Sequence, residues 1–215
     1  MKIYCDSCDV EAIKKYKDLG IVDGVTTNPS TIAKSGKNFK AVVTEICKII
    51  DTSVSVEVIS TKYESMLTEA EELTNIASQI TVKLPITEDG LRACKTLTEK
   101  GVTVNMTLCF SPTQALLAAK VGATYVSPFV GRLDDMGRNG LDLIADICTI
   151  YGNYPNVSTQ ILAASIRNPI HIIEAAKLGV DVITLPPNII SNMIDNPLTE
   201  KGVNIFLDDW KKAKV

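Results

Sequence analysis

The sequence of 215 residues contains a single histidine, His171. No second histidine and no two pairs of cysteines at zinc-ligand spacing accompany it, so the sequence suggests neither a zinc site nor a histidine-based catalytic group. No cluster of carboxylates suggests a magnesium site. We therefore expect no metal ion and no other cofactor.

Long apolar runs and an excess of positive charge are also missing. No apolar stretch reaches the ~18 residues of a membrane-spanning helix, and the segment MKIYCDSCDV carries acids where a signal peptide is basic and apolar. Lysine and arginine total 22 against 25 acidic residues, a net charge of −3. This balance does not suggest nucleic acid or a membrane as a partner. We expect a cytoplasmic protein that binds any anion through local groups.

The six cysteines are irregularly spaced, and most lie inside apolar runs. Cys5 and Cys8 have the spacing of a redox or zinc motif, but no second pair follows them. We interpret all six as reduced packing residues. A hydrophobic content of 46% is typical of a globular chain, and no linker divides the sequence. The sequence thus predicts a single domain over 1–215.

Short strand-like segments alternate with longer helical segments along the chain. The predicted strands are Lys2–Asp6, Gly24–Asn28, Val54–Ile59, Ile80–Pro85, Val102–Leu108, Thr124–Val130, Thr159–Ser165 and Asp181–Pro186. The predicted helices are Val10–Leu19, Phe39–Ile50, Tyr63–Ala77, Gly90–Lys100, Thr113–Lys120, Leu141–Tyr151, Pro169–Lys177 and Ile189–Ile194. A further helix over 198–212 follows, and we expect it to pack on the domain or on a neighbouring subunit.

About eight β-then-α units predict a small (β/α)8 TIM barrel, a fold of ~200 residues or more. A doubly wound open sheet is the alternative, and the count alone does not exclude it. The alternation within Val54–Val58, Ile80–Leu84 and Val102–Leu108 favours the barrel, because apolar residues hold one face and polar residues the other. An open sheet between two layers of helices is apolar on both faces.

The same alternation gathers one set of side chains at the C-terminal ends of the strands. Barrel enzymes place their chemistry at this end. The residues expected to point inward there are Asp6, Thr26, Asn28, Glu57, Lys83, Asn105, Thr107, Ser127, Phe129 and Ser165.

Lys83 is the most informative of these residues because it lies inside an apolar strand. Burial disfavours the charged ammonium group and lowers the pKa of a lysine. A free amine can attack a carbonyl to form a Schiff base, and the protonated imine permits cleavage of a nearby carbon–carbon bond. The alternatives are a buried ion pair with Glu57 and a phosphate-binding cation.

Asp6 and Glu57 place two carboxylates near this amine. They can move protons during imine formation and cleavage, or they can simply balance its charge. Asn105 and Thr107 can orient a catalytic water or a sugar hydroxyl, or they can fill a polar layer of the barrel.

Arg132 and Arg167 follow the sixth and seventh predicted strands, and Ser165 lies close to the second arginine. Two guanidinium groups, a hydroxyl and the N-terminus of the next helix are suited to binding a phosphate. The alternative is that the arginines form surface ion pairs with Asp134 or Asp135.

Four motifs together resemble the small transaldolase group. They are GVTTNPS at 24–30, TVKLP at 81–85, NMTL at 105–108 and YVSPFVGR at 125–132. The resemblance covers essentially the whole chain in order. It implies a (β/α)8 barrel shared with the fructose-6-phosphate aldolases and a metal-free Schiff-base mechanism.

The resemblance also implies a role for each matching position. Lys83 would form the imine with a ketose phosphate, and Asp6 would be the acid and base of the cleavage step. Glu57 and Thr107 would hold and activate the water of imine formation and hydrolysis. The residues around the dihydroxyacetone unit would be Thr26, Asn28, Asn105, Ser127 and Phe129, and those of the phosphate site Arg132, Ser165 and Arg167.

Glu57 and Phe129 separate the two branches of this group. Fructose-6-phosphate aldolases characteristically have glutamine and tyrosine at these positions, so this chain follows the transaldolase pattern. A phenol can help to protonate and release the three-carbon unit, whereas a phenyl ring cannot.

The activity implied is transfer of dihydroxyacetone within the non-oxidative pentose phosphate pathway. The donor would be sedoheptulose 7-phosphate or fructose 6-phosphate, and the acceptor glyceraldehyde 3-phosphate or erythrose 4-phosphate. The alternatives are a fructose-6-phosphate aldolase and, in another class, a non-catalytic barrel that binds sugar phosphates. The resemblance further implies a homo-oligomer, a decamer of two pentameric rings or a pentamer, in which the C-terminal helix reaches a neighbour.

Overall fold

The computed structural model describes residues 1–36 and 38–213, and eight parallel strands in it form a closed barrel. Each strand pairs with the next, and the last strand closes the barrel by pairing with the first. This confirms the predicted (β/α)8 fold. The strands are β1 (Lys2–Asp6), β2 (Gly24–Thr26), β3 (Ser53–Glu57), β4 (Ile80–Pro85), β5 (Val104–Cys109), β6 (Tyr125–Pro128), β7 (Gln160–Ala163) and β8 (Val182–Leu185).

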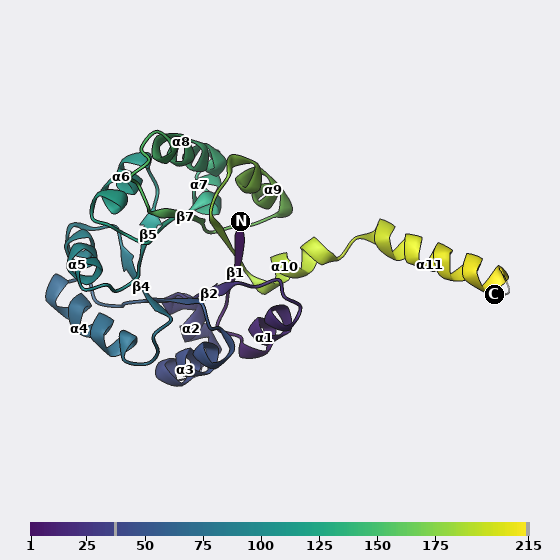
Figure 1. Cartoon of the computed structure of the whole chain (residues 1–215), viewed down its shortest axis with the longest axis horizontal. Coiled ribbons are helices and arrows are strands. Elements are labelled where there is room, and N and C mark those ends of the chain that lie inside the picture. Colours follow the sequence, from purple (N-terminus) through teal and green to yellow (C-terminus); the bar gives the residue numbers. More distant parts are fainter. Residues whose placement is uncertain (37, 214–215) are drawn as a thin grey trace.

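Helices surround the barrel in chain order (Figure 1). They are α1 (Val10–Asp18), α2 (Pro29–Ser35), α3 (Phe39–Ile49), α4 (Tyr63–Thr74), α5 (Glu88–Glu99), α6 (Pro112–Lys120), α7 (Val130–Asp134), α8 (Gly140–Gly152), α9 (Pro169–Leu178) and α10 (Pro187–Ile194). Helices α6 and α9 begin with a side-chain cap before a proline: Ser111 accepts a hydrogen bond from the Gln114 amide, and Asn168 accepts one from the His171 amide.

Two short helices, α2 and α7, were not predicted from the sequence. Asn28, expected to continue a strand, instead caps α2, because its side chain accepts a hydrogen bond from the Thr31 amide and Pro29 opens the helix. Val130, also expected in a strand, is the first residue of α7. Both helices follow strand ends at the barrel mouth, so they bring additional side chains to that rim.

The alternation of the strands separates an outer apolar layer from a polar interior, as predicted. Val54 and Val82 face the helices and belong to the main hydrophobic core. Ser55, Thr81 and Asn105 have the opposite parity, and all three are buried. Polar groups in such a place need hydrogen-bond partners, and the interior supplies them within its own layers.

Two tyrosines pack against each other below the mouth. The rings of Tyr4 and Tyr125 meet edge to face with their centroids 6.3 Å apart, and their hydroxyl oxygens are 3.2 Å apart. Both belong to a second buried cluster with Leu162 and Val182. Tyr4 lies two residues before Asp6 on β1 and shares its face, so aromatic packing begins directly beneath the polar mouth.

All six cysteines are free, in agreement with the sequence interpretation. Cys5, Cys8, Cys94 and Cys109 are buried. Burial raises the pKa of the Cys5 thiol to about 12, and the nearby Cys8 Sγ lies 3.4 Å from the Thr31 hydroxyl. The Cys5–Cys8 spacing therefore reflects packing on either side of a strand end.

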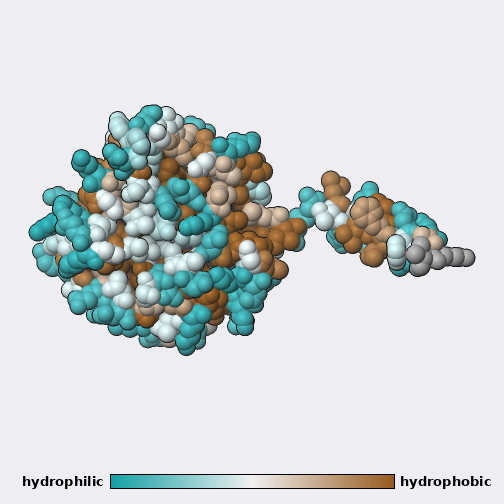
Figure 2. Space-filling view, in the orientation of Figure 1, coloured by the Kyte–Doolittle hydropathy of each residue, from teal (hydrophilic) through white to brown (hydrophobic). Residues whose placement is uncertain are grey.

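The C-terminal helix α11 (Pro197–Lys212) projects away from the barrel (Figure 1). None of its residues is buried, so it does not pack on the chain's own barrel, the first of the two predicted arrangements. Figure 2 shows hydrophobic atoms along this helix and around the junction where it leaves the barrel. In the described part of the chain, no helix combines the length and apolar character needed to cross a membrane.

The tight packing below the mouth predicts that Gly24→Ala destabilises the protein. A Cβ at Gly24 would lie 2.7 Å from the Tyr4 ring and 2.8 Å from the Ser53 carbonyl oxygen, and such overpacking costs about 1–3 kcal/mol. The measurement is the free energy of unfolding in urea. Gly152→Ala is the matched control, since a Cβ there meets nothing within 4 Å, and equal stability of the two variants would contradict the prediction.

Candidate active site

The C-terminal ends of the strands surround a cavity of about 640 Å³. The predicted site residues that line it are Asp6, Thr26, Asn28, Glu57, Lys83, Ser127, Phe129, Arg132, Ser165 and Arg167. Asn105 and Thr107 are completely buried and are not part of this lining. The fold therefore brings together nearly all side chains that the strand alternation selected.

Lys83 lies in the buried wall of this cavity, on β4. Its Nζ is 3.0 Å from a carboxylate oxygen of Glu57 and donates a hydrogen bond of 3.1 Å to the Thr27 carbonyl oxygen. The parallel register makes Glu57 the direct neighbour of Lys83 across β3 and β4. The ion pair considered from the sequence is thus present, and it holds the amine in a fixed position at the cavity wall.

Asp6 ends β1 on the same cavity. Its Oδ1 accepts hydrogen bonds from the Thr26 hydroxyl at 3.2 Å and the Asn28 amide at 3.5 Å. Burial raises the pKa of the Asp6 carboxyl, while the positive charge of Lys83 and these two hydrogen bonds oppose the rise. The pKa of Asp6 is therefore higher than that of an exposed aspartate, which suits a group that exchanges a proton with a substrate.

Asn105 is held on both sides by buried hydroxyl groups. Its Oδ1 accepts a hydrogen bond of 2.7 Å from Ser127, and its Nδ2 donates one of 3.2 Å to Ser55. Asn105 is also the neighbour of Lys83 in the register between β4 and β5. The amide orientation is therefore determined by its neighbours before any ligand arrives.

A bulge in β5 shapes the wall beside Lys83. The register between β5 and β6 shifts between Met106 and Cys109, and Leu108 has a positive φ of 59°. Leu108 faces the cavity and is 41% exposed. Thr107 Oγ1 is buried and has no hydrogen-bond partner among the described residues, so it remains available to a ligand hydroxyl or a water.

Arg132, Ser165 and Arg167 gather at one side of the mouth. Arg167 pairs with Asp135 at 3.0 Å, as the surface-pair alternative proposed, but both side chains are about half exposed. Exposed pairs of this kind are weak, so this contact leaves the guanidinium accessible to an anion. The first residues of α9 are not part of the cavity lining, and the side chain of its cap Asn168 accepts a hydrogen bond from the His171 amide.

The cavity also has an apolar side. The ring of Phe129 packs edge to face against Phe110, with centroids 5.6 Å apart. Phe129 carries no hydroxyl, so this wall offers no proton donor from the ring. Leu108 and Ile166 add to the apolar lining.

Sequence reasoning did not select several residues of the site. Thr184 lines the cavity and its hydroxyl lies 2.7 Å from that of Thr26. It is the inward polar residue of β8, so the same alternation could have identified it. Leu108 had no comparable signal, since a leucine with positive φ is not recognisable from residue type.

Comparison of the sequence with known proteins identifies the family of this chain. The family model described as "Transaldolase/Fructose-6-phosphate aldolase" matches residues 3–214. A probable transaldolase of Nitrosopumilus maritimus is 52% identical over 214 residues, covering 100% of this chain and 96% of the relative. Probable transaldolases of a Ruegeria species and of Brucella ovis are 55% and 56% identical and cover at least 98% of either chain.

A family match of this extent agrees with the closed barrel and with the lysine, aspartate and glutamate at its mouth. The chain belongs to the transaldolase/fructose-6-phosphate aldolase family and is an enzyme of the transaldolase type.

Proposed function

We propose that this protein transfers a dihydroxyacetone unit from a ketose phosphate to an aldose phosphate through a Schiff base on Lys83. The observation that carries the proposal is the buried Lys83 amine beside Glu57, with Asp6 on the same cavity. The donors are sedoheptulose 7-phosphate or fructose 6-phosphate, and the acceptors are glyceraldehyde 3-phosphate or erythrose 4-phosphate. This reaction belongs to the non-oxidative pentose phosphate pathway in the cytoplasm.

The first step forms the imine. Glu57 is 3.0 Å from Nζ and is placed to accept a proton from the ammonium group, after which the amine attacks the ketone carbon. Glu57 then returns its proton to the carbinolamine hydroxyl, which leaves as water and gives the protonated imine. Thr107 is suited to bind this water because its buried Oγ1 has no other partner among the described residues.

The second step breaks the carbon–carbon bond. The Asp6 carboxylate accepts the proton of the hydroxyl group next to this bond, the first aldehyde leaves, and the bonding electron pair moves into the protonated imine to give an enamine. The aldehyde acceptor then binds, the enamine carbon attacks its carbonyl, and Asp6 returns the proton. Hydrolysis of the new imine releases the product.

Substrate orientation follows from the remaining groups. Asn105 is fixed by Ser55 and Ser127, and such a preorganised amide is suited to a hydroxyl of the three-carbon unit. Arg132, Arg167 and Ser165 are suited to the phosphate. Phe129 cannot protonate the enamine, which supports transfer to an acceptor over simple aldol cleavage.

Trapping with borohydride tests the covalent step. Incubation with fructose 6-phosphate and borohydride should add mass to the peptide that contains Lys83. Lys83→Arg keeps the positive charge but should abolish the adduct and lower turnover by about a thousandfold or more, as expected for loss of a nucleophile. Lys40→Arg is the control, because Lys40 forms an exposed ion pair of the same length with Glu72. A phosphate-stabilised protein without an adduct would support a non-catalytic binding barrel.

The role of Asp6 predicts the pH dependence of the reaction. Asp6 acts as a carboxylate, so activity falls as the pH decreases through its raised pKa. Thr26→Val removes a hydrogen bond that stabilises the carboxylate, which raises the pKa further and moves the acidic limb of kcat/KM to higher pH. Thr81→Val is the control, since Thr81 contacts Ser53 and Thr103. An unmoved acidic limb in Thr26→Val would contradict the assignment of the base.

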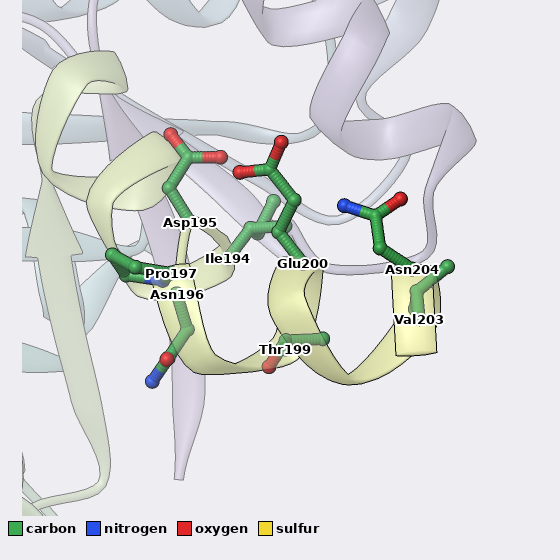
Figure 3. A pocket seen from close by; sticks show the side chains of 8 residues that line it. All are labelled: Ile194, Asp195, Asn196, Pro197, Thr199, Glu200, Val203 and Asn204. Atoms are coloured by element: carbon green, nitrogen blue, oxygen red, sulfur yellow. The ribbon is translucent and has the colours of Figure 1, made fainter. Parts of the chain in front are cut away.

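The projecting helix α11 supports the proposed homo-oligomer. Val203, Phe206, Leu207 and Trp210 recur at helical spacing, and all four are more than half exposed. An apolar stripe of this length is typical of an interaction surface. A pocket of about 490 Å³ lies where α10 ends and α11 begins. The side chains of Asp195, Glu200 and Asn204 point to one side of it (Figure 3). We expect a second copy of the chain to cover this stripe.

Light scattering tests this arrangement. The wild-type protein should be a pentamer or decamer, and Phe206→Glu combined with Trp210→Glu should shift it to a smaller species, because two charges enter the apolar stripe. Lys201→Glu lies on the opposite face of α11 and should leave the mass unchanged. A wild-type monomer would contradict the proposal without affecting the chemistry at Lys83.

A further inference from the structure

The only histidine of the chain, His171, lies behind the proposed phosphate site and has a partner for each ring nitrogen. Its Nε2 is 3.1 Å from Oδ2 of Asp134, and its Nδ1 accepts a hydrogen bond of 3.4 Å from the Arg167 backbone amide. The His171 side chain is only 10% exposed. A neutral imidazole with its proton on Nε2 satisfies both contacts, because one nitrogen then donates and the other accepts.

These contacts join two segments that come from different strand ends. Asp134 ends α7, the short helix that follows β6 and carries Arg132. Arg167 follows β7 in the segment that begins α9. His171 therefore bridges the two elements that provide the two arginines of the cavity.

Backbone hydrogen bonds also join the start of α7 to the segment that follows β7. The amides of Val130 and Gly131 donate hydrogen bonds of 3.0 and 2.9 Å to the carbonyl oxygens of Ala164 and Ser165. A Cβ on Gly131 would lie 2.5 Å from Cγ of Arg167, so the arginine side chain lies directly against the glycine backbone. Ser165 has a positive φ of 58°, a conformation that its surroundings must maintain.

The ion pair of Arg167 with Asp135 restrains Arg167 less than the contacts of His171 do. Both of its side chains are about half exposed, and exposed pairs contribute little to stability. It also involves the guanidinium itself, which must be free to meet an anion. The Nδ1 contact of His171 instead involves the backbone amide of Arg167, so it can persist when the guanidinium changes partner.

We propose that His171, together with Asp134, is a positioning residue that sets the spacing of Arg132 and Arg167 and thereby the affinity for the substrate phosphate. This inference rests on the proposed function, because it assigns the two arginines to the phosphate. His171 does not touch the cavity and takes no part in the chemistry at Lys83. Its effect should therefore be confined to ligands that carry a phosphate.

The experiment compares a phosphorylated and an unphosphorylated ketone. His171→Phe keeps a ring and removes both contacts. The KM for fructose 6-phosphate should therefore rise roughly tenfold, a change of the size expected when a hydrogen bond to a charged group such as Asp134 is lost. The kcat and the borohydride adduct formed from dihydroxyacetone should stay near wild type. Binding of inorganic phosphate, measured by calorimetry, should weaken by a similar factor.

Two further variants separate positioning from general damage. His171→Asn keeps an acceptor near the place of Nδ1, so it should recover part of the loss. Glu174→Gln breaks the exposed pair with Lys177 on the same helix and should change nothing. An unchanged KM and phosphate affinity in His171→Phe, or an equal loss of the dihydroxyacetone adduct, would overturn the inference.

Failure of the proposed function would look different. Wild-type protein would then form no adduct with either ketone. Phosphate binding would still be measurable in the wild type and in His171→Phe, so the positioning role can be accepted or rejected on that result alone.

Discussion

The ion pair between Lys83 and Glu57 imposes the main constraint on this barrel. Two charges removed from water lose several kcal/mol of solvation each, and close contact offsets that loss only when the geometry is good. The register of β3 and β4 provides this geometry by making the two residues direct neighbours. Loss of one partner would leave an unpaired buried charge, at a cost of about 3–5 kcal/mol. The Thr27 carbonyl oxygen accepts a further hydrogen bond from the amine, so part of the lost solvation of Lys83 is replaced by the barrel itself.

The strand alternation made most of this site predictable from the sequence. Alternation is a local property, since neighbouring residues of a strand face opposite sides wherever the strand lies. Glu57, Lys83 and Asn105 could therefore be assigned to one interior before any strand order was known. Helix caps are equally local, and Ser111 and Asn168 begin helices as their residue types indicate. The resemblance carried by the family motifs then implied a role for each of these residues, which the strand alternation alone cannot do.

The remaining features depend on contacts between distant segments. The bulge at Leu108 and the positive φ of Ser165 arise where one strand end meets another. Residue type alone does not predict them. The partners of His171 come from α7 and from the segment after β7, so the histidine looked isolated in the sequence. The direction of α11 was likewise unpredictable, because an apolar stripe indicates that a helix is covered but not by which surface.

The tyrosine pair beneath the mouth has a consequence for the order of events. Tyr4 and Tyr125 pack against each other below the mouth, and Lys83 lines the cavity at the mouth itself. For the proposed transfer, the departing aldehyde and the incoming one would occupy this same cavity in turn. In the proposed mechanism, the three-carbon unit would stay bound to Lys83 after the first aldehyde leaves and before the second one binds. The kinetics should then follow a substituted-enzyme pattern in which both sugars never occupy the barrel together.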